Sequence, residues 1–387
     1  MAVTVNQSPT TPNVTNTNLV YTLGSLSSSN AQFRYVTDIY ESGSGDFITR
    51  IRTYPNLYGS GIIDVARELD DQLGYDLNWK VSGSIAAINN VNTFDLRFGE
   101  EYAPSISGSI TLYTGSTPNY LQVFPGTVYK NEGSYNFNTT AITTASNILS
   151  NTPEAVINPE VEEYVFVGAD DYHTITVLDA DASIGINLYD TTGTFVSQSV
   201  VSADAFGTIG IGPANLTWNV DFTQMSRITV SSLGTPNYSI WLPGYDKYPC
   251  SEEYTRFAFI NEYGFWDYYN VYNPLRSSNQ VDRSLYDKTF VRYEDSISGY
   301  NISNRGTTQY RTEYNKSYII TTDYITKQIS DWLTELFESP EVFIQTGDNF
   351  IPINITNTNI RWNMNTSREK LFQYDIEFKY ANQPQSR

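Results

Sequence analysis

The sequence contains one cysteine, Cys250, and one histidine, His173, among 387 residues. A single cysteine cannot form a disulfide within the chain. Zinc sites need several His or Cys ligands, so one residue of each kind cannot form a zinc site. A Ser-His-Asp or Cys-His catalytic system would have to use His173, and the sequence around it has neither a nucleophile elbow nor a paired cysteine. We therefore interpret His173 as a structural residue and expect no catalytic residues, no cofactor and no enzyme activity.

Charged residues are also scarce, at 17%, and basic residues are the scarcer kind. The 23 Lys and Arg against 42 Asp and Glu give a net charge of −19 and an isoelectric point of about 4.4. Recognition of phosphates depends on Lys and Arg, so this balance argues against a nucleic-acid partner. It argues equally against binding to an anionic membrane surface. Basic residues do gather around Arg276, Arg283, Lys288 and Arg292, but acidic neighbours dilute them.

Long apolar runs are missing as well. No run approaches the ~18 consecutive apolar residues that mark a membrane-spanning helix. The opening residues, MAVTVNQSPTTPNV, lack the basic and apolar segments of a signal peptide. We therefore expect a soluble protein that is made in the cytoplasm.

Stretches rich in Glu, Lys, Leu and Ala are nearly absent, which argues against a helical bundle. Aromatic residues reach 14%, with 31 Tyr, and Asn, Thr and Ser are abundant. This composition favours strands and turns. The length suits two or three domains. We predict a mainly β, multidomain protein of β-sandwich-like domains, with one or two short helices packed on the sheets.

Changes of composition along the chain predict four parts. Residues 1–32 are polar apart from an apolar island at Leu19–Leu23, and we interpret them as an extended N-terminal arm, either mobile or docked on a neighbouring subunit. Residues 33–154 are predicted to form an N-terminal β domain, with paired strands at Phe33–Tyr40 and Asp46–Tyr54 and a further strand at Asp76–Ser82. A linker is predicted near Asn151–Pro159, between two prolines. Residues 155–245 are predicted to form an inserted β-sandwich module. Its seven short candidate strands are Tyr164–Val167, Thr174–Leu178, Gly185–Tyr189, Thr194–Val200, Leu216–Phe222, Arg227–Ser231 and Tyr238–Leu242. Residues 246–387 are predicted to form a C-terminal β domain, either separate from 33–154 or continuous with it.

Three local patterns predict particular elements. Asp64 is placed to cap a short helix that Gly74 ends. Apolar residues recur every three to four positions over 323–338, which predicts an amphipathic helix capped by Asp323 or the residue before it. The segment Leu371–Asn382 alternates between apolar and polar residues, which predicts a half-buried strand.

The most aromatic stretch is Tyr254–Tyr272, which reads YTRFAFINEYGFWDYYNVY. Two runs rich in aromatic and β-branched residues flank a turn at Asn261–Gly264, which predicts a β-hairpin. Alternation gives the second strand two aromatic faces, Phe265 and Tyr269 on one and Trp266, Tyr268 and Tyr272 on the other. Both faces must therefore be covered, either by the protein's own core or by a partner subunit.

The run Phe259-Ile260-Asn261, followed by Gly264 and Trp266-Asp267-Tyr268-Tyr269, resembles a segment of virion structural proteins of tailed bacteriophages. Such proteins also tend to have an extended opening segment, an FRYV-like strand and a turn region before a short helix. The matching segments here are Phe33–Val36, Tyr54-Pro55-Asn56 and Gly59–Gly61. The resemblance covers roughly the first and last thirds of the chain.

The resemblance implies a non-catalytic virion protein of the neck, tail or baseplate. It would be one copy in a ring, in contact with other copies and other virion proteins. On this interpretation we expect the assembly contacts to include Trp266, Tyr268, Tyr269 and Tyr272 of the hairpin and Leu19, Val20 and Tyr21 of the arm. Replacing Trp266 with Ala would then abolish assembly more than folding.

A second interpretation is a carbohydrate-recognising adhesin or receptor-binding protein that uses 155–245 as a lectin-like module. Trp218 and Trp241 are then candidates to stack on sugar rings, the alternative being that both belong to the core. Asp179 and Asp181 are weak Ca²⁺ candidates, but EF-hand spacing is absent, so we interpret them as solvated turn carboxylates and predict no metal site. A glycoside hydrolase needs two opposed carboxylates, and with 42 acidic residues some pair can always be found.

Overall fold

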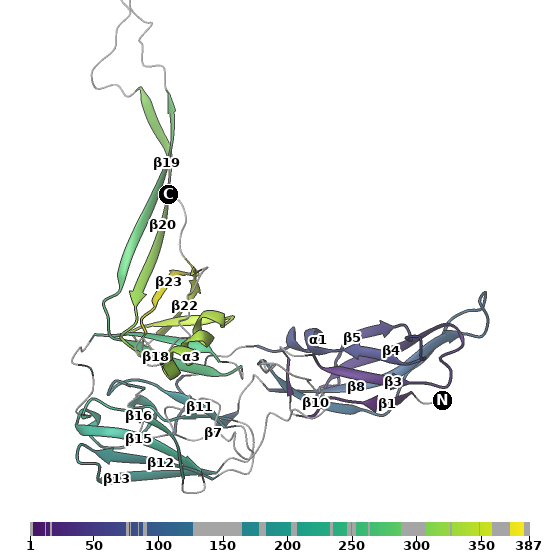
Figure 1. The fold of residues 1–387 in the computed structure, drawn as a ribbon, viewed down its shortest axis with the longest axis horizontal. Coiled ribbons are helices and arrows are strands. Elements are labelled where there is room, and N and C mark those ends of the chain that lie inside the picture. Colours follow the sequence, from purple (N-terminus) through teal and green to yellow (C-terminus); the bar gives the residue numbers. More distant parts are fainter. Residues whose placement is uncertain are drawn as a thin grey trace, which may run out of the picture. The chain divides into compact units, whose positions relative to one another are not determined.

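The structure is a computed structural model, and the fold is mainly β, as predicted (Figure 1). It describes residues 3–11, 13–15, 18–74, 77, 79–83, 85–87, 91–126, 165–177, 183–202, 207–232, 235–245, 249, 253–261, 264–287, 306–325, 327–347, 349–357 and 372–382. Two compact units make up the chain. The first comprises Met1–Cys250, Phe259–Tyr269 and Asp331–Pro340, and the second comprises Ser251–Ala258, Asn270–Ser330 and Glu341–Arg387.

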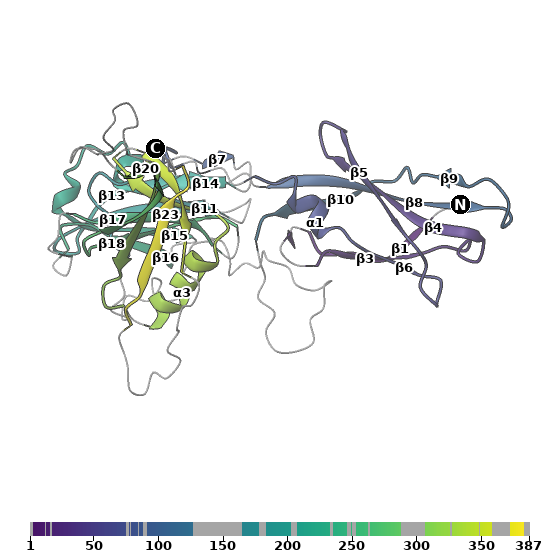
Figure 2. The same cartoon turned by 90° about the horizontal axis from the view of Figure 1, so that it is seen from above.

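The N-terminal part of the first unit is a sandwich of two sheets (Figure 2). One sheet has three antiparallel strands in the order β1 (Thr4–Gln7), β3 (Val20–Gly24) and β6 (Gly61–Asp64). The other has the order β2 (Asn13–Val14), β10 (Asn119–Phe124), β8 (Asn92–Ala103), β4 (Ala31–Glu41) and β5 (Phe47–Thr53), with β9 (Thr111–Tyr113) also paired to β8. The hairpin that β4 and β5 form was predicted from the sequence.

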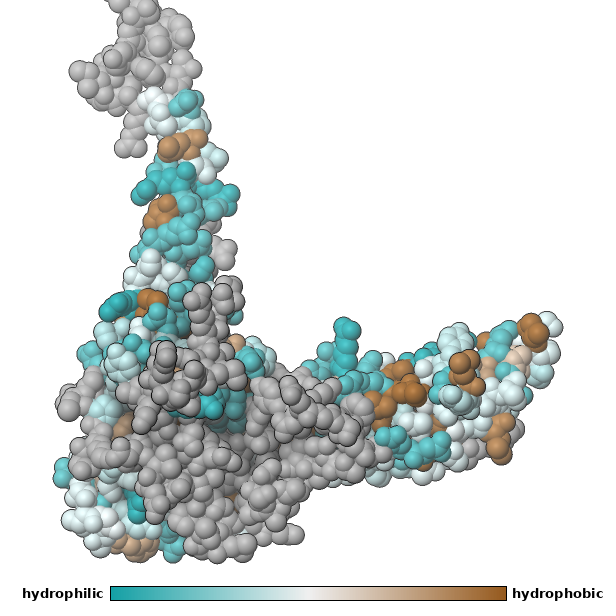
Figure 3. Space-filling model, viewed as in Figure 1, coloured by the Kyte–Doolittle hydropathy of each residue, from teal (hydrophilic) through white to brown (hydrophobic). Residues whose placement is uncertain are grey.

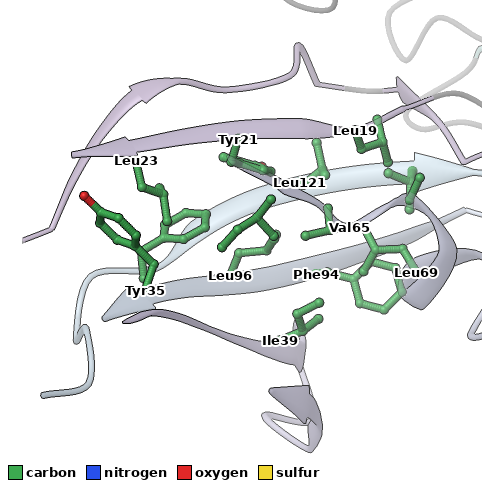
Figure 4. Packing of buried hydrophobic residues seen from close by; sticks show 14 of the residues in the cluster. Leu19, Tyr21, Leu23, Tyr35, Ile39, Val65, Leu69, Phe94, Leu96 and Leu121 are labelled. Carbon is green, nitrogen blue, oxygen red and sulfur yellow. The ribbon is translucent and has the colours of Figure 1, made fainter. Parts of the chain in front are cut away.

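The apolar island of the predicted arm lies inside this sandwich (Figure 4). Leu19, Tyr21 and Leu23 are 0–2% exposed and pack against side chains of the opposite sheet, including Leu96 and Leu121. These three residues are two positions apart, and this spacing places them on one face of a half-buried strand. The prediction of a mobile or docked arm over residues 1–32 is therefore wrong for the residues described, which form three strands of the sandwich.

The helix predicted after Asp64 is present but short. It is α1 (Ala66–Asp70), preceded by Val65. The Asp64 carboxylate accepts hydrogen bonds from the backbone N–H groups of Ala66, at 3.1 Å, and Leu19, at 2.9 Å. Asp64 therefore joins the helix start to β3, in addition to serving the first turn.

The middle part of the first unit contains two further sheets. One is β11 (Thr174–Val177), β14 (Gly207–Gly210) and β7 (Ile85–Ala87). The other is β13 (Phe195–Ser202), β12 (Ser183–Asp190), β15 (Met225–Ser232) and β16 (Thr235–Trp241), all antiparallel. Four of the predicted strands correspond to β11, β12, β13 and β15, and a fifth, Tyr238–Leu242, overlaps β16. The predicted strand Leu216–Phe222 is wrong, because irregular chain and short 3-10 turns, η1 (Pro213–Asn215) and η2 (Phe222–Gln224), occupy this region.

The middle part is not a clean insertion, because β7 comes from the stretch assigned to the N-terminal domain. Asn215 holds the neighbouring segment in place: its amide nitrogen donates to the carbonyl oxygens of Trp79, at 2.9 Å, and Val81, at 2.6 Å. Its side-chain oxygen accepts from the backbone N–H of His173 at 2.8 Å. The predicted strand Asp76–Ser82 is absent over the residues described there. The predicted linker around 151–159 lies outside the described residues.

The remaining strands belong to one sheet of seven. They are β17 (Thr255–Ile260), β18 (Trp266–Val271), β19 (Arg276–Asp287), β20 (Thr307–Thr321), β21 (Val342–Thr346), β22 (Asn349–Ile355) and β23 (Asp375–Tyr380), in the order β18-β17-β21-β22-β23-β20-β19. The predicted alternation of the last strand is confirmed, with Ile376 and Phe378 fully buried and Asp375 and Glu377 exposed.

The second helix, α3 (Lys327–Glu338), begins later than predicted. Ile325 instead exchanges two backbone hydrogen bonds with Phe372, at 2.7 and 2.9 Å. The Asp323 carboxylate accepts from the Tyr272 backbone and the Asn273 side chain, so it does not cap the helix. The predicted apolar stripe is confirmed over the helix, where Ile329, Trp332, Leu333 and Leu336 are at most 8% exposed.

Two leucines of the N-terminal segment test whether this segment is core or arm. Leu23 is fully buried, whereas Leu26 is fully exposed. We expect Leu23→Ala to lower the free energy of unfolding by about 2–5 kcal/mol, because it leaves a cavity in the sandwich. Leu26→Ala should change it by less than about 0.5 kcal/mol. Urea denaturation of both variants measures this, and equal, negligible effects would show that the segment is detached from the core.

Candidate assembly surface

The aromatic hairpin predicted at Tyr254–Tyr272 is confirmed as β17 and β18. In the turn, Gly264 has φ +81°, in the left-handed region, and its ideal Cβ would lie 1.0 Å from the carbonyl oxygen of Pro125. Only glycine meets both conditions. The Asn261 side chain accepts from the Phe265 backbone N–H at 2.9 Å and closes the turn.

One face of β18 packs on the middle part of the same unit. The Tyr268 hydroxyl is 3.0 Å from the hydroxyl of Thr174, and its ring lies 5.2 Å from the ring of His173. His173 is 1% exposed, and its Nε2 lies 2.8 Å from the Tyr238 hydroxyl. His173 therefore occupies a packed position inside this unit.

The other face of β18 packs on α3. The Trp332 Nε1 donates to the Asp267 carboxylate at 2.8 Å, and the Asn261 amide donates to the same carboxylate at 3.3 Å. Asp267 is only 2% exposed, so these donors compensate a carboxylate that is removed from water. The Trp332 ring also lies 5.8 Å from the ring of Tyr269, edge to face, and 5.7 Å from that of Phe259.

Most of the predicted contact residues are therefore interior residues. Those that are at most 8% exposed within the single chain are Trp266, Tyr268, Tyr269, Leu19 and Tyr21. Tyr272 and Val20 are half-buried. The sequence allowed either the protein's own core or a partner subunit to cover the two aromatic faces of this strand. In the structure, the same chain covers both faces. The assignment of the five buried residues to an assembly interface is corrected on this ground.

A different element has the features of an assembly surface. β19 and β20 extend past β23 as a two-stranded ribbon (Figure 1). β20 pairs with β23 only over Tyr318–Thr321, and β19 is the last strand of the sheet. We name the paired segments beyond this point, 278–287 and 307–317, the ribbon. Among the residues described, no third strand pairs with the ribbon, so its outer backbone edges face away from the sheet.

The ribbon has one polar face and one mixed face. Register and alternation place Val281 opposite Tyr314 on the mixed face, with Lys316 and Tyr318 further along it. Lys316 lies 4.7 Å from the centre of the Tyr318 ring, and a hydrogen bond with the Tyr318 hydroxyl raises the pKa of Lys316. A bulge at Ser284 shifts the register and precedes the end of the strand.

Large apolar side chains on the ribbon are open to solvent. Their exposed fractions are 40% for Val281, 58% for Leu285, 46% for Tyr286 and 67% for Tyr310. Tyr286 and Tyr310 have ring centres 6.0 Å apart. Figure 3 shows hydrophobic residues interspersed with hydrophilic ones along the ribbon. β19, RSSNQVDRSLYD, is polar, so its sequence gives no sign of an apolar surface. The tyrosines at every fourth position of β20, Tyr310, Tyr314 and Tyr318, are the signal that could have revealed it.

The middle part has a second notable surface, a row of cross-strand partners on the outer face of the four-stranded sheet. The row consists of Phe195, Tyr189, Arg227 and Trp241, which face one another in register across β13, β12, β15 and β16. The Arg227 guanidinium lies 4.7 Å from the centre of the Tyr189 ring and 5.7 Å from that of Trp241. Tyr245 extends the row, with its ring centre 4.2 Å from that of Trp241.

Polar side chains lie beside this row on the same face. The Asn187 amide donates to the Ser231 hydroxyl at 3.2 Å, and Gln198 is the cross-strand partner of Asn187. The Thr229 hydroxyl is buried and has no hydrogen-bond partner among the residues described. Trp241, one of the two tryptophans singled out from the sequence, belongs to the row. Trp218 is half-buried and lies between η1 and η2.

The two Ca²⁺ candidates from the sequence, Asp179 and Asp181, lie outside the described residues. Within the described ranges, no three His, Cys, Asp or Glu residues come together as metal ligands could. The helices of those ranges are all too short or too polar to cross a bilayer.

The buried position of Trp266 changes the expected effect of its replacement. We now expect Trp266→Ala to lower the free energy of unfolding by about 3–5 kcal/mol, because a large aromatic side chain leaves a cavity. Thermal or urea unfolding of the purified variant measures it. Tyr310→Ala, at an exposed aromatic position, is the control and should leave stability within about 0.5 kcal/mol. A Trp266→Ala protein of unchanged stability would restore the assignment of this residue to an interface.

Comparison with known proteins gives little to set beside this geometry. No family model matches the chain, and no curated protein matches it. Among solved structures, one match is a chain described as "Biofilm associated protein - BSP domain", at 9% identity and a TM-score of 0.16. The match covers 82% of this chain and 62% of that chain. At this TM-score the likeness carries no argument about fold or function.

Proposed function

We propose that this chain is a structural component of a tailed bacteriophage virion, a ring subunit of the neck, tail or baseplate that acts through protein–protein assembly. It would be made in the cytoplasm of the host bacterium and then built into the virion. The sequence resemblance is the reason for proposing a virion protein. The exposed ribbon is the observation that supports a role in assembly.

A two-stranded ribbon is a poor final state for a protein alone in water. Isolated hairpins are marginally stable, since each strand is paired on one edge only. Exposed edges also invite pairing with other chains, and natural proteins usually protect them. This ribbon has Lys316 and a bulge as protection, but it leaves Leu285 and Tyr310 more than half exposed. An element of this kind is explained if another virion subunit covers it, through strand addition or packing on its mixed face.

Shortening the ribbon tests the proposal. Ser277 and Tyr318 are directly opposite, so an Asn-Gly turn can join them and remove 278–317 while the pairing with β23 remains. We expect the shortened chain to fold. Its amount in density-purified virions of the phage that encodes it should fall by about tenfold or more, since each ~1.4 kcal/mol of lost binding energy is tenfold in affinity.

The matched point variants are Tyr310→Ser and Gln309→Ser, neighbours of which only the first removes apolar surface. Mass spectrometry of the purified particles measures incorporation. A decrease for Tyr310→Ser alone agrees with the proposal. Absence of the full-length chain from particles, or normal incorporation of the shortened chain, would refute it.

The second candidate function is carbohydrate recognition by the middle part, as in a receptor-binding protein. Its support is the row Phe195, Tyr189, Arg227 and Trp241 beside the amide and hydroxyl groups of that face. Aromatic rings offer flat apolar surfaces to the C–H groups of sugars, and neighbouring amides can bind sugar hydroxyls.

Trp241→Ala tests this candidate function on the whole chain. Glycan-array screening followed by calorimetry should show sugar binding by the wild type and a loss of affinity of about tenfold, or ~1.4 kcal/mol, in the variant. Trp218→Ala removes the same side chain away from the row and should bind as the wild type does. Phe195→Ser, at a side chain 53% exposed, repeats the test with less effect on folding. Wild-type protein without affinity for any glycan would eliminate this function.

A further inference from the structure

The outer face of the six-stranded N-terminal sheet carries four arginines, Arg34, Arg50, Arg52 and Arg97, which we name the arginine face. They come from three adjacent strands, β4, β5 and β8. Register places Asp38 between Arg50 and Arg97, and Arg34 opposite Glu101. The opposite face of the same strands, with Tyr35, Ile39 and Leu96, is the core.

Each arginine of this face is held by a carboxylate beneath it. Arg50 donates two hydrogen bonds to Asp38, at 2.5 and 2.8 Å, and Arg97 donates two to Asp95, at 2.8 and 3.0 Å. Glu101 forms ion pairs with both Arg34, at 2.9 Å, and Arg52, at 3.2 Å. The hydrogen bond to Asp38 raises the pKa of the Arg50 guanidinium.

The charges on this face are layered. The side chains of Asp38, Glu101 and Asp95 are 3–9% exposed, whereas those of the four arginines are 26–43% exposed. Four cations therefore stand over three anions, and the cations are the groups that an approaching molecule meets. Their side chains are already fixed, so binding would cost them little conformational entropy.

Exposed aromatic rings surround the arginines. Tyr54 is 70% exposed and lies under the Arg34 guanidinium at 5.7 Å. Phe47 is 54% exposed and packs on Tyr40, which in turn lies 4.3 Å from the Arg97 guanidinium. Tyr120 is 61% exposed and is the cross-strand partner of Asp95. Arg and aromatic residues are enriched at the energetic centres of protein interfaces, and Lys is depleted. β4, β5, β8 and β10 contain no Lys.

We propose that the arginine face docks on an acidic surface of a second copy of this chain. This rests on the proposed assembly function and adds the surface that one subunit offers to the next. Charge complementarity identifies the partner, since the rest of the chain, without the four arginines and three carboxylates of this face, has 39 acidic and 19 basic residues. Guanidinium groups in a fixed array also suit carboxylates, which they can bind in a bidentate manner.

The same charges exclude one arrangement of the two copies. The arginine face cannot pack against the arginine face of the neighbour, because like charges would repel. It must therefore meet a different surface of the neighbouring copy. Where this contact repeats head to tail, it leads to a ring if the rotation closes.

The test is the mass of the purified full-length chain by analytical ultracentrifugation over a range of protein concentrations. The variant is Arg52→Gln with Tyr54→Ser, because both side chains are exposed and Glu101 keeps Arg34 as its partner. The matched control is Arg67→Gln with Tyr58→Ser, at exposed positions of the same sandwich away from this face. Thermal unfolding of both verifies that they are folded.

We expect the wild type and the control to associate alike, and the variant to associate about tenfold more weakly. Association of the wild type should also weaken between about 50 and about 500 mM NaCl, because exposed ion pairs are screened. A wild type that stays monomeric, or a variant that associates like the control, overturns the proposal. A short DNA oligonucleotide serves as a phosphate probe. If the variant loses binding to this oligonucleotide while its self-association is unchanged, the proposal is also overturned.

The two proposals fail separately. If the variant associates normally while the shortened ribbon is excluded from virions, the second-copy contact is wrong and the assembly function stands. If the chain self-associates through this face but is absent from virions, the virion function is wrong.

Discussion

A sheet has two faces and two edges, and each must be covered by protein or suited to water. In the residues described, only α1 and α3 are helical beyond short turns, so sheets must cover other sheets. The sandwich around Leu19 and Leu96 follows from this constraint. For β18 the middle part of the same unit covers one face, and the helix α3 covers the other. What the chain leaves uncovered is then informative: an edge and face of the ribbon, the row around Arg227, and the arginine face.

Elements were predictable from the sequence where their own pattern of apolar residues shows which side is buried. The alternation that ends in Ile376 and Phe378 needs no knowledge of a partner, and neither does the apolar stripe of α3. Predictions failed where a distant segment competed. The start of α3 was placed too early because Ile325 pairs with Phe372, far along the chain. The N-terminal segment was interpreted as an arm because it has few apolar residues. Those few are enough to anchor the segment in the core, because the buried ones pack against the opposite sheet.

The candidate surfaces were harder to predict than the fold. Aromatic density pointed to Trp266 and Tyr268, yet density of this kind measures apolar surface without saying what covers it. The surfaces found here lie on strands of polar composition, where exposure depends on register. Asp38 is flanked by Arg50 and Arg97 only because β5 and β8 pair with β4 in one particular alignment. Trp241 was identified from the sequence, but its neighbours Tyr189 and Arg227 come from other strands.

A net charge of −19 on every copy opposes the assembly of identical copies. Distance resolves the conflict, because at physiological ionic strength the screening length is about 8 Å. Repulsion between charges spread over two whole subunits is mostly screened beyond that length, whereas groups within hydrogen-bond reach interact almost fully. Assembly of an acidic protein then depends on a few local surfaces of opposite or neutral character. The ribbon, with three basic and three acidic side chains in 278–287 and 307–317, and the arginine face both meet this requirement.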